Sequence, residues 1–405
     1  MHRRVAVTGL GIISAIGNNV PAFWESLRQG RPGIRDMELV DRSQFRFQMG
    51  AEVPNYDPLA WFEGRETELL DRFAQFALIA TQEAVGQAAI EWTPELRART
   101  AIVTGTSAGG QKSADDGFYE FYYKRNKRVN PLSVPRIMAN AGASHISMRY
   151  GITGPAWTVS TACSSSNHAI GQAFWMVRSG AADCAIAGGS EAVFHFGFLK
   201  TWEAMRVVST DTCRPFSRDR KGLILGEGGA MLVLEPLESA RARGATVFAE
   251  LAGFGMSADA HHITQPSVEG ASAAMRGALA DARSNQEEIG YINAHGTGTA
   301  ANDPAETKAI RCVFGAHADR LAVSSTKSMH GHTLGAAGAI ESVATILALR
   351  NGVLPPTANY TTPDPECDLD VVPNVAREAP ISAALSNSFA FGGLNAVLLF
   401  RSVNT

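Results

Sequence analysis

The chain has 405 residues, of which 45% are apolar and 19% charged, and its formal net charge is −3. This length and composition predict a large core in two domains, or in one domain built from two similar halves. The small net charge gives no reason to expect nucleic acid or a membrane surface as a partner, and no uncharged apolar run reaches the roughly 20 residues of a transmembrane helix.

Apolar segments bounded by glycine alternate with amphipathic helices along the chain, which predicts an α/β architecture. Helices are predicted at 71–85 and 271–282, because each segment carries an apolar stripe at helical spacing. The predicted strands, in chain order, are 3–9, 100–105, 157–162, 184–189, 230–236, 290–296, 321–326, 382–388 and 395–400. Since the first of them starts at residue 3, no cleavable signal is expected before it.

The two halves of the sequence resemble each other. Gly105 aligns with Gly296, and Cys163 aligns with Lys327. An internal duplication accounts for both matches and predicts two α/β halves related by a pseudo-twofold axis. The first half has an aromatic and basic insertion at about 108–140, which is a candidate lid, dimer contact or docking surface. The second half has about eight extra residues at "MHGHTLGA".

The five cysteines are scattered and form no CxxC pair; they are Cys163, Cys184, Cys213, Cys312 and Cys367. This pattern argues against a disulfide framework and a thiolate zinc site, and it favours the cytoplasm. Cys163 stands between a predicted strand and a helix, in "TACSSS". The helix N-terminus contributes at most about 2 kcal/mol, so we expect the pKa of this thiol to fall from ~8.5 to roughly 7.

Three further motifs carry candidate functional groups. In "NAHGTGTAAND", His295 opens a loop in which Thr297 and Thr299 offer hydroxyl groups. In "SSTKSMHGHTLGAAGAIES", Lys327 and His332 enter a helix that also carries Glu341. The pair His330-x-His332 has no third ligand at suitable spacing, so we predict no metal site. In "SNSFAFGGLN", Phe389 is expected in the core, whereas Phe391 precedes two glycines and is free to move. Cys163, His295, Lys327 and His332 each stand at the C-terminal end of a predicted strand, where open α/β sheets place their sites.

With these motifs, the sequence closely resembles the β-ketoacyl-[acyl-carrier-protein] synthases of the KAS I/II type, in the thiolase-like superfamily. The likeness runs from "VAVTGLGIISAIGN" to "SNSFAFGGLNAVLLF" and includes "RPFSRDRKGLILGEGGAMLVLE". It implies duplicated βαβαβαββ halves in a five-layered αβαβα sandwich, with an N-terminal half at 1–248 and a C-terminal half at 249–405. It also implies a homodimer without cofactors.

The resemblance implies a role for each candidate residue. Cys163 would carry the acyl chain as a thioester, and the backbone N–H groups of Cys163 and Phe391 would form an oxyanion hole. His295 and His332 would assist the decarboxylation of malonyl carrier protein, and the resulting carbanion would attack the acyl-cysteine. Lys327, paired with Glu341, would organise the charge near His332. Thr297 and Thr299 would bind the phosphopantetheine arm, Phe389 and Phe391 would contact the substrate, and Phe391 would also act as a gate.

Some positions depart from the family pattern. Leu394 stands where threonine is usual, and His330 stands where threonine or serine is usual. His330, together with 199–207 and 358–375, resembles specialised nodulation-type synthases, whereas "TACSSS" is also similar to polyketide ketosynthases. Fatty-acid elongation and a dedicated secondary pathway therefore both remain open.

Three alternatives to an independent condensing enzyme remain. In the first, the chain is a catalytic subunit that needs a chain-length-factor partner. In the second, it is itself a non-catalytic partner of that kind. In the third, it is a degradative thiolase. Cys163 with both histidines argues against the non-catalytic partner, and the lack of a second C-terminal cysteine argues against the thiolase. Acyl carrier proteins are acidic, so Arg206 and the run Lys124, Arg125, Lys127 and Arg128 are candidate docking groups.

Overall fold

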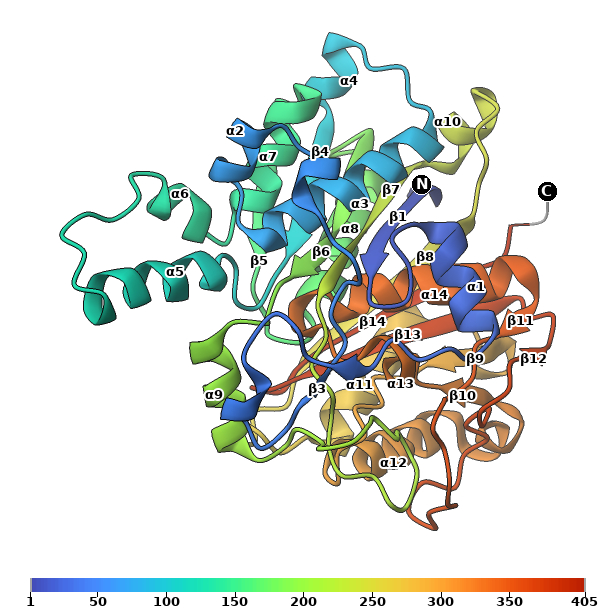
Figure 1. Ribbon diagram of the computed structural model, residues 1–405. Coiled ribbons are helices and arrows are strands. Elements are labelled where there is room, and N and C mark those ends of the chain that lie inside the picture. The colour runs from blue at the N-terminus through green and yellow to red at the C-terminus, as the bar shows by residue number, and fades with distance from the viewer. Residues whose placement is uncertain (1, 404–405) are drawn as a thin grey trace.

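One mixed sheet of ten strands runs through the molecule in the computed structural model, which describes residues 2–403 (Figure 1). Its order across the sheet is β10 (Ala322–Ser324), β9 (Ile289–Asn293), β13 (Ala383–Ala390), β14 (Leu394–Arg401), β8 (Ala249–Ala258), β1 (Val5–Ser14), β7 (Gly228–Pro236), β6 (Cys184–Glu191), β4 (Thr100–Gly105) and β5 (Ala156–Val159). The remaining strands are the short pairs β2 (Arg35–Asp36) with β3 (Met49–Gly50) and β11 (Val353–Leu354) with β12 (Arg377–Glu378).

The sheet consists of two halves with the same topology, which confirms the predicted duplication. Counted along the chain, the five strands of each half lie in the sheet in the order 3-2-4-5-1. Strands 3, 2 and 4 are parallel, whereas strands 4, 5 and 1 pair antiparallel. The halves meet where β1 pairs antiparallel with β8, over only three residues from Val5 to Val7. The two sets of parallel strands therefore run to a common region between the halves.

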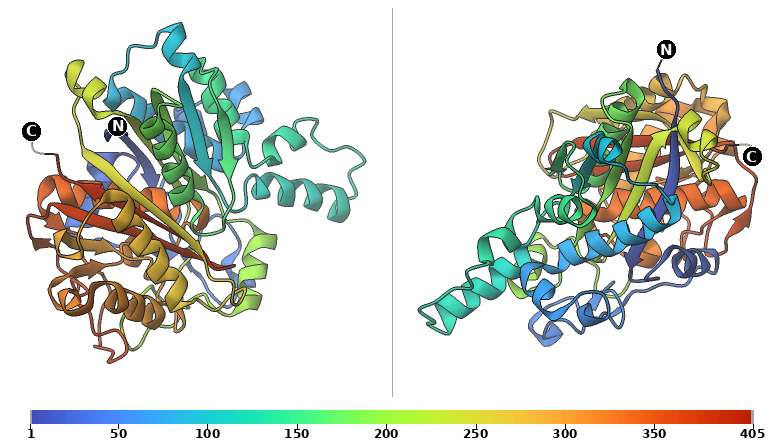
Figure 2. Two further views of the ribbon diagram at one scale, coloured as in Figure 1. Left: turned by 180° about the vertical axis from the view of Figure 1, so that it is seen from behind. Right: turned by 90° about the horizontal axis from the view of Figure 1, so that it is seen from above.

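Helices form three layers around the two half-sheets. The central layer consists of α8 (Ser165–Ser179) and α14 (Ala337–Asn351), which pack on each other and on strands of both halves. Because α14 lies between the two half-sheets, it is apolar and buried on nearly all sides. The outer layers are α3 (Arg72–Ala88) and α7 (Ala141–Tyr150) on one half, and α11 (Val268–Ala282) and α12 (Asn302–Phe314) on the other (Figure 2). This is the five-layered αβαβα sandwich expected of a thiolase-like fold.

The smaller helices lie between these layers and at the surface. They are α1 (Val20–Arg28), α2 (Gly64–Leu69), α4 (Pro94–Ala98), α9 (Phe196–Met205), α10 (Leu237–Ala242), α13 (Lys327–His330) and the 3-10 turns η1 (Arg42–Gln44), η2 (Pro58–Ala60), η4 (Gln286–Glu288), η5 (Gly315–Arg320) and η6 (Leu334–Ala336). None of the helices within residues 2–403 has the length and apolar character needed to cross a bilayer.

All nine predicted strands and both predicted helices are present, with ends shifted by a few residues. The prediction missed β8, whose sequence "AELAGFGMSA" has two glycines and little alternation of apolar and polar residues. The predicted strand at 290–296 ends at Asn293, because the chain turns into the loop of His295 there.

The predicted insertion forms an arm that projects from the body of the molecule (Figures 1 and 2). It contains α5 (Gln111–Phe118), the π-helical turn η3 (Tyr119–Tyr123) and α6 (Ser133–Ile137). Its large side chains are exposed; Phe118, Tyr122 and Tyr123 have 57%, 64% and 74% of their surface accessible. Exposed aromatic clusters of this kind mark surfaces that bind other molecules.

Candidate active site

A tight turn between β5 and α8 presents Cys163. The strand ends at Val159 and the helix begins at Ser165, so the thiol lies just before the helix N-terminus, as predicted. Ala162 has φ +49°, a left-handed conformation that is rare for residues other than glycine. The turn is held by hydroxyl groups: Ser165 Oγ donates to the carbonyl of Ala162, and Ser164 Oγ donates to the carbonyl of Leu394. The unusual side chain at Leu394 leaves the second contact intact, because the backbone supplies its acceptor.

The loops after β9 and β10 bring in groups from the other half of the chain. His295 follows β9, and its backbone N–H and that of Gly296 donate to the buried carboxylate of Glu306 at 2.8 and 2.7 Å. Lys327 begins α13 directly after β10, and His332 follows that helix. His332 lies in the extra segment "MHGHTLGA", which precedes α14 and has no counterpart before α8.

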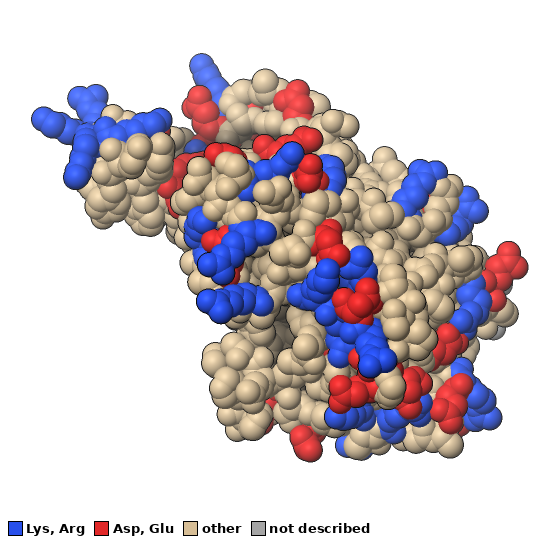
Figure 3. Space-filling view, turned by 60° about the horizontal axis from the view of Figure 1, so that its bottom comes forward, with Lys and Arg blue, Asp and Glu red and all other residues tan. Residues whose placement is uncertain are grey.

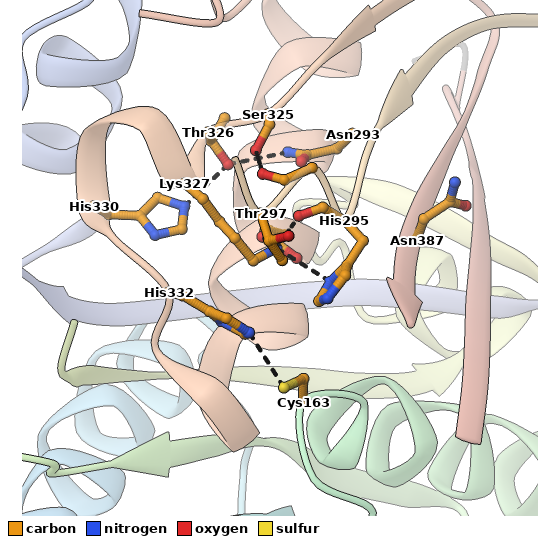
Figure 4. A network of polar contacts seen from close by, with 12 residues as sticks. Cys163, Asn293, His295, Thr297, Ser325, Thr326, Lys327, His330, His332 and Asn387 are labelled. Carbon is orange, nitrogen blue, oxygen red and sulfur yellow. Dashed lines mark hydrogen bonds and ion pairs between the residues drawn. The ribbon is translucent and has the colours of Figure 1, made fainter. Parts of the chain in front are cut away.

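These elements converge on one cavity of about 330 Å³ between the halves. Nε2 of His332 lies 3.2 Å from Sγ of Cys163, and the rings of His295 and His332 are 5.4 Å apart and nearly perpendicular (Figure 4). Cys163, His295 and His332 line the cavity together with the predicted Thr297, Thr299, Phe389 and Phe391.

The hydrogen bonds around the two histidines assign their tautomers. The backbone N–H of Leu334 points at Nδ1 of His332 at 3.3 Å, and the ammonium group of Lys327 points at Nδ1 of His295 at 3.4 Å. Both Nδ1 atoms are therefore acceptors, so the single proton of each neutral ring lies on Nε2. Burial and the charge of Lys327 lower the pKa of both imidazoles well below 6.5, which keeps them neutral. The site thus offers two neutral N–H donors.

The pKa predicted for Cys163 was wrong. Burial raises the pKa of this thiol to about 12, and the charge of Lys327 and the backbone N–H of Phe391 offset only part of that rise. The prediction of roughly 7 counted the helix N-terminus but not the loss of solvent, and only 6% of the residue is exposed. The resting cysteine is a thiol that receives a hydrogen bond from His332.

Lys327 lies behind the cavity and does not line it. Its ammonium group forms a completely buried ion pair with Glu341 and donates to the backbone carbonyl of His295 at 2.7 Å. The expected pair with Glu341 is present, but its direct contacts are with His295 rather than His332. Burial raises the pKa of Glu341 to about 7, and Lys327 opposes the rise.

The two threonines and the two phenylalanines line other parts of the cavity wall. The hydroxyl groups of Thr297 and Thr299 are 2.8 Å apart. Phe389 contacts the edge of His295, with ring centroids 6.1 Å apart, and Phe391 stacks on Trp202 at 6.2 Å. Phe391 therefore combines a backbone N–H near the thiol with a ring at the cavity wall.

Several residues of the site escaped the sequence analysis, among them Glu306 and Trp202. Glu306 holds the loop of His295 through a hydrogen bond from its backbone N–H. In the sequence, the only feature that could have indicated this role is a carboxylate at a position of α12 that faces the interior. Trp202 lines the cavity; it lies in the segment 199–207, which was noted for its resemblance to nodulation-type synthases and not as part of the site. Within the described residues, no group of three or more His, Cys, Asp or Glu side chains could hold a metal ion.

The sequence matches the family described as Beta-ketoacyl synthase, with its N-terminal domain at residues 2–240 and its C-terminal domain at residues 248–361. It is 47% identical to Nodulation protein E of Rhizobium sp. (strain N33), covering 100% of both chains, and 40% identical to 3-oxoacyl-[acyl-carrier-protein] synthase 2 of Staphylococcus aureus (strain COL), covering 99% of this chain and 98% of that one. The solved structure described as the ishigamide ketosynthase/chain length factor has a TM-score of 0.95 at 38% identity and covers 100% of both chains. The chain therefore belongs to the beta-ketoacyl synthase family.

Proposed function

We propose that the chain is a 3-oxoacyl-[acyl-carrier-protein] synthase that extends a cysteine-bound acyl chain by two carbons from malonyl carrier protein. The observation that carries this proposal is the contact of 3.2 Å between His332 Nε2 and Cys163 Sγ at the wall of a cavity that also contains His295. A nucleophile beside two neutral N–H donors suits a reaction in which negative charge develops first on a thioester oxygen and then on an enolate.

Cys163 accepts the acyl group in the first step. Its sulfur loses a proton to solvent and attacks the thioester carbonyl of the acyl carrier protein, whose pantetheine thiol leaves. The hydrogen bond from His332 and the charge of Lys327 favour the thiolate, which burial opposes. The backbone N–H groups of Cys163 and Phe391 receive the oxyanion of the tetrahedral intermediate.

Malonyl carrier protein reacts in the second step. Its carboxylate leaves as carbon dioxide, and the electron pair of the broken C–C bond moves into an enolate whose oxygen accepts from His295 and His332. The enolate carbon then attacks the acyl-cysteine carbonyl, and the Cys163 thiolate is released with the 3-oxoacyl product on the carrier. Because both donors are neutral, they stabilise the enolate without protonating it.

The other residues position these groups. Lys327, held by Glu341, fixes the ring and the loop of His295 through two contacts. Thr297 and Thr299 hold the pantetheine arm in the cavity. Phe391 acts as a gate between the two steps, and Phe389, which packs against His295, contacts the substrate in the cavity.

Acyl carrier protein is the proposed partner, carrying the acyl group and then the malonyl group. Arg206 caps the C-terminus of α9, next to the cavity-lining Met205, whereas Lys124, Arg125, Lys127 and Arg128 lie on the arm. Figure 3 shows basic side chains both at the end of a projecting arm and on the body of the molecule. Since Arg206 is nearer the cavity, it is the first docking candidate.

We further propose a cytoplasmic homodimer whose subunits each comprise two halves, residues 1–248 and 249–405. The repeated strand order supports the division, because β8 begins the second set at Ala249. The exposed aromatic face of the arm supports a subunit contact. The likeness to a ketosynthase/chain length factor structure favours a second assembly, in which this chain is the catalytic subunit of a heterodimer.

The test is to incubate the purified chain with a panel of acyl carrier proteins and then with malonyl carrier protein. Mass spectrometry is expected to find an acyl adduct on the Cys163 peptide and then a 3-oxoacyl product two carbons longer. A Cys163→Ala variant should give neither. An active chain without any partner identifies the independent enzyme, and activity that appears only with a chain-length factor identifies the heterodimer. Condensation by Cys163→Ala would contradict the proposal.

A further inference from the structure

His330 is a completely buried histidine to which the proposed mechanism gives no role. It ends α13, two residues before His332; it does not line the cavity, and its ring lies beside Thr326 rather than beside Cys163 (Figure 4). Both ring nitrogens are nevertheless occupied: Nδ1 lies 2.8 Å from the carbonyl oxygen of Gly331, and Nε2 lies 3.0 Å from Oγ1 of Thr326.

The partners of His330 fix the direction of each hydrogen bond. The carbonyl oxygen of Gly331 can only accept, so Nδ1 carries the ring proton. Nε2 of the neutral ring must then accept from the hydroxyl of Thr326, whose oxygen accepts from Nδ2 of Asn293 at 3.4 Å. Burial and the charge of Lys327 lower the pKa of His330 to about 3, so the ring remains neutral. His330 thus links Thr326, next to Lys327, with Gly331, next to His332.

The peptide between Gly331 and His332 is held at both of its polar atoms. The carbonyl of Gly331 accepts from His330, and the N–H of His332 donates to the carbonyl of Ile224 at 2.7 Å. Gly331 has φ +69°, and a Cβ at this position would lie 2.7 Å from that of Ala51. The residue must therefore be glycine, which leaves this peptide freer to rotate than any other residue would. Rotation would move the imidazole of His332 away from the thiol.

We propose that His330 is a positioning residue, which fixes the carbonyl of Gly331 and thereby aims the Nε2–H of His332 at Sγ of Cys163. The role of His332 as the donor rests on the proposed function, whereas the geometry of the His332–Cys163 contact does not. Thr326 serves as the anchor that holds the His330 ring in place.

Two amide variants separate the two hydrogen bonds of His330. In His330→Asn, the amide nitrogen occupies the place of Nδ1 and still donates to Gly331, but the side chain does not reach Thr326. In His330→Gln, the amide reaches the place of Nε2 and loses the contact with Gly331. His330→Leu removes both bonds. Ser328→Ala is the matched control, because this buried hydroxyl on the same helix bonds the backbone of Ser325 and Ala358 and not Gly331.

The first measurement is the rate at which iodoacetamide alkylates Cys163 at fixed pH, followed by mass spectrometry of the Cys163 peptide. A lost hydrogen bond from His332 raises the thiol pKa and lowers the thiolate fraction, while the nucleophilicity of the thiolate rises by a smaller factor; we expect the rate to fall about threefold. We expect this fall in His330→Gln and His330→Leu, whereas His330→Asn and Ser328→Ala stay within about twofold of the unaltered protein. Decarboxylation of malonyl carrier protein should follow the same order.

The outcomes distinguish positioning from packing. If His330→Gln reacts as fast as His330→Asn, or if all three variants slow equally with equal losses of melting temperature, the proposal is overturned. The comparison of the two amides decides the question even if His330→Leu does not fold. If the unaltered protein decarboxylates no malonyl carrier protein, the proposed function fails, while the alkylation series still tests His330.

Discussion

His332 Nε2 lies 3.2 Å from Cys163 Sγ, although the two residues are 169 positions apart and come from opposite halves of a duplicated chain. The parallel strands of both halves end in the region between the halves, so the turn after β5 faces the loops after β9 and β10. Because His332 and Cys163, the proposed donor and nucleophile, belong to different halves, neither half forms this contact alone.

The pH dependence of Cys163 alkylation tests the effect of burial on the thiol. With a pKa of about 12, the thiolate fraction rises about tenfold per pH unit throughout the range in which the protein is handled. We therefore expect the rate of alkylation by iodoacetamide to rise steadily between about pH 7 and about pH 9, measured on the Cys163 peptide. A rate that levels off above about pH 8 would instead indicate a thiol with a pKa near 7, and would contradict the burial effect.

Replacement of His332 by alanine separates the two chemical steps. The variant lacks one of the two N–H donors to the enolate, and the loss of such a donor costs about 10²- to 10³-fold in rate. We expect this fall in carbon dioxide release from malonyl carrier protein. Acyl loading of Cys163, followed by mass spectrometry, should fall far less, because its oxyanion is held by backbone N–H groups. Equal losses in both steps would rule out this division of roles.

Removal of Lys327 should destabilise the fold in a pH-dependent way. Lys327→Met leaves the carboxylate of Glu341 buried without its partner, which costs about 3–5 kcal/mol in the free energy of unfolding. Burial already holds the folded pKa of Glu341 at about 7, above its ordinary value of 4.5, and loss of Lys327 raises it further. The folded state then binds more protons than the unfolded state, so stability falls as pH rises above about 4.5.

Urea denaturation of Lys327→Met should accordingly give a lower midpoint at about pH 8 than at about pH 5. The double variant Lys327→Met with Glu341→Gln is the control, since it carries no buried carboxylate at this position. It should recover part of the stability and lose the pH dependence. A single variant with the same midpoint at both pH values would show that Glu341 is not the cause.

Charge reversal at Arg206 tests where the carrier protein docks. Arg206→Glu should raise the apparent KM for malonyl carrier protein about threefold to tenfold, with less effect at high ionic strength, because the carrier is acidic. The kcat and the kinetics with a small malonyl thioester should stay unchanged. Arg128→Glu on the arm is the matched comparison; a larger effect there would move the docking surface from the cavity mouth to the arm.

Substitutions on the aromatic face of the arm test the proposed subunit contact. Burying an aromatic side chain contributes about 1.5–3 kcal/mol, so replacing Tyr122 and Phe118 by serine should raise the dimer dissociation constant at least about tenfold. Sedimentation velocity at micromolar concentration is expected to show monomer for this variant. Leu59→Ser, which alters a side chain with 65% exposure elsewhere, is the control. An unchanged dimer would exclude this face of the arm as the contact.

Much of the fold could be predicted from the sequence because strand and helix patterns are local. The strands flanked by glycine were found with small shifts at their ends, and the duplication was visible from the matching positions of Gly105 and Gly296. The strand β8 was missed, since its glycines weaken the alternation and its place is decided by pairing with β1 and β14.

The sequence by itself determined which groups follow the strands of the site: Cys163, His295, Lys327 and His332 each stand in a short motif after a strand. Only the tertiary structure decided their chemical state. Burial at the interface of the two halves raised the thiol pKa, and hydrogen bonds from Leu334 and Lys327 placed the imidazole protons on Nε2. Glu306 and Trp202 were missed for the same reason: solvation, packing and hydrogen bonding depend on which segments meet in space, and a motif specifies only neighbours along the chain.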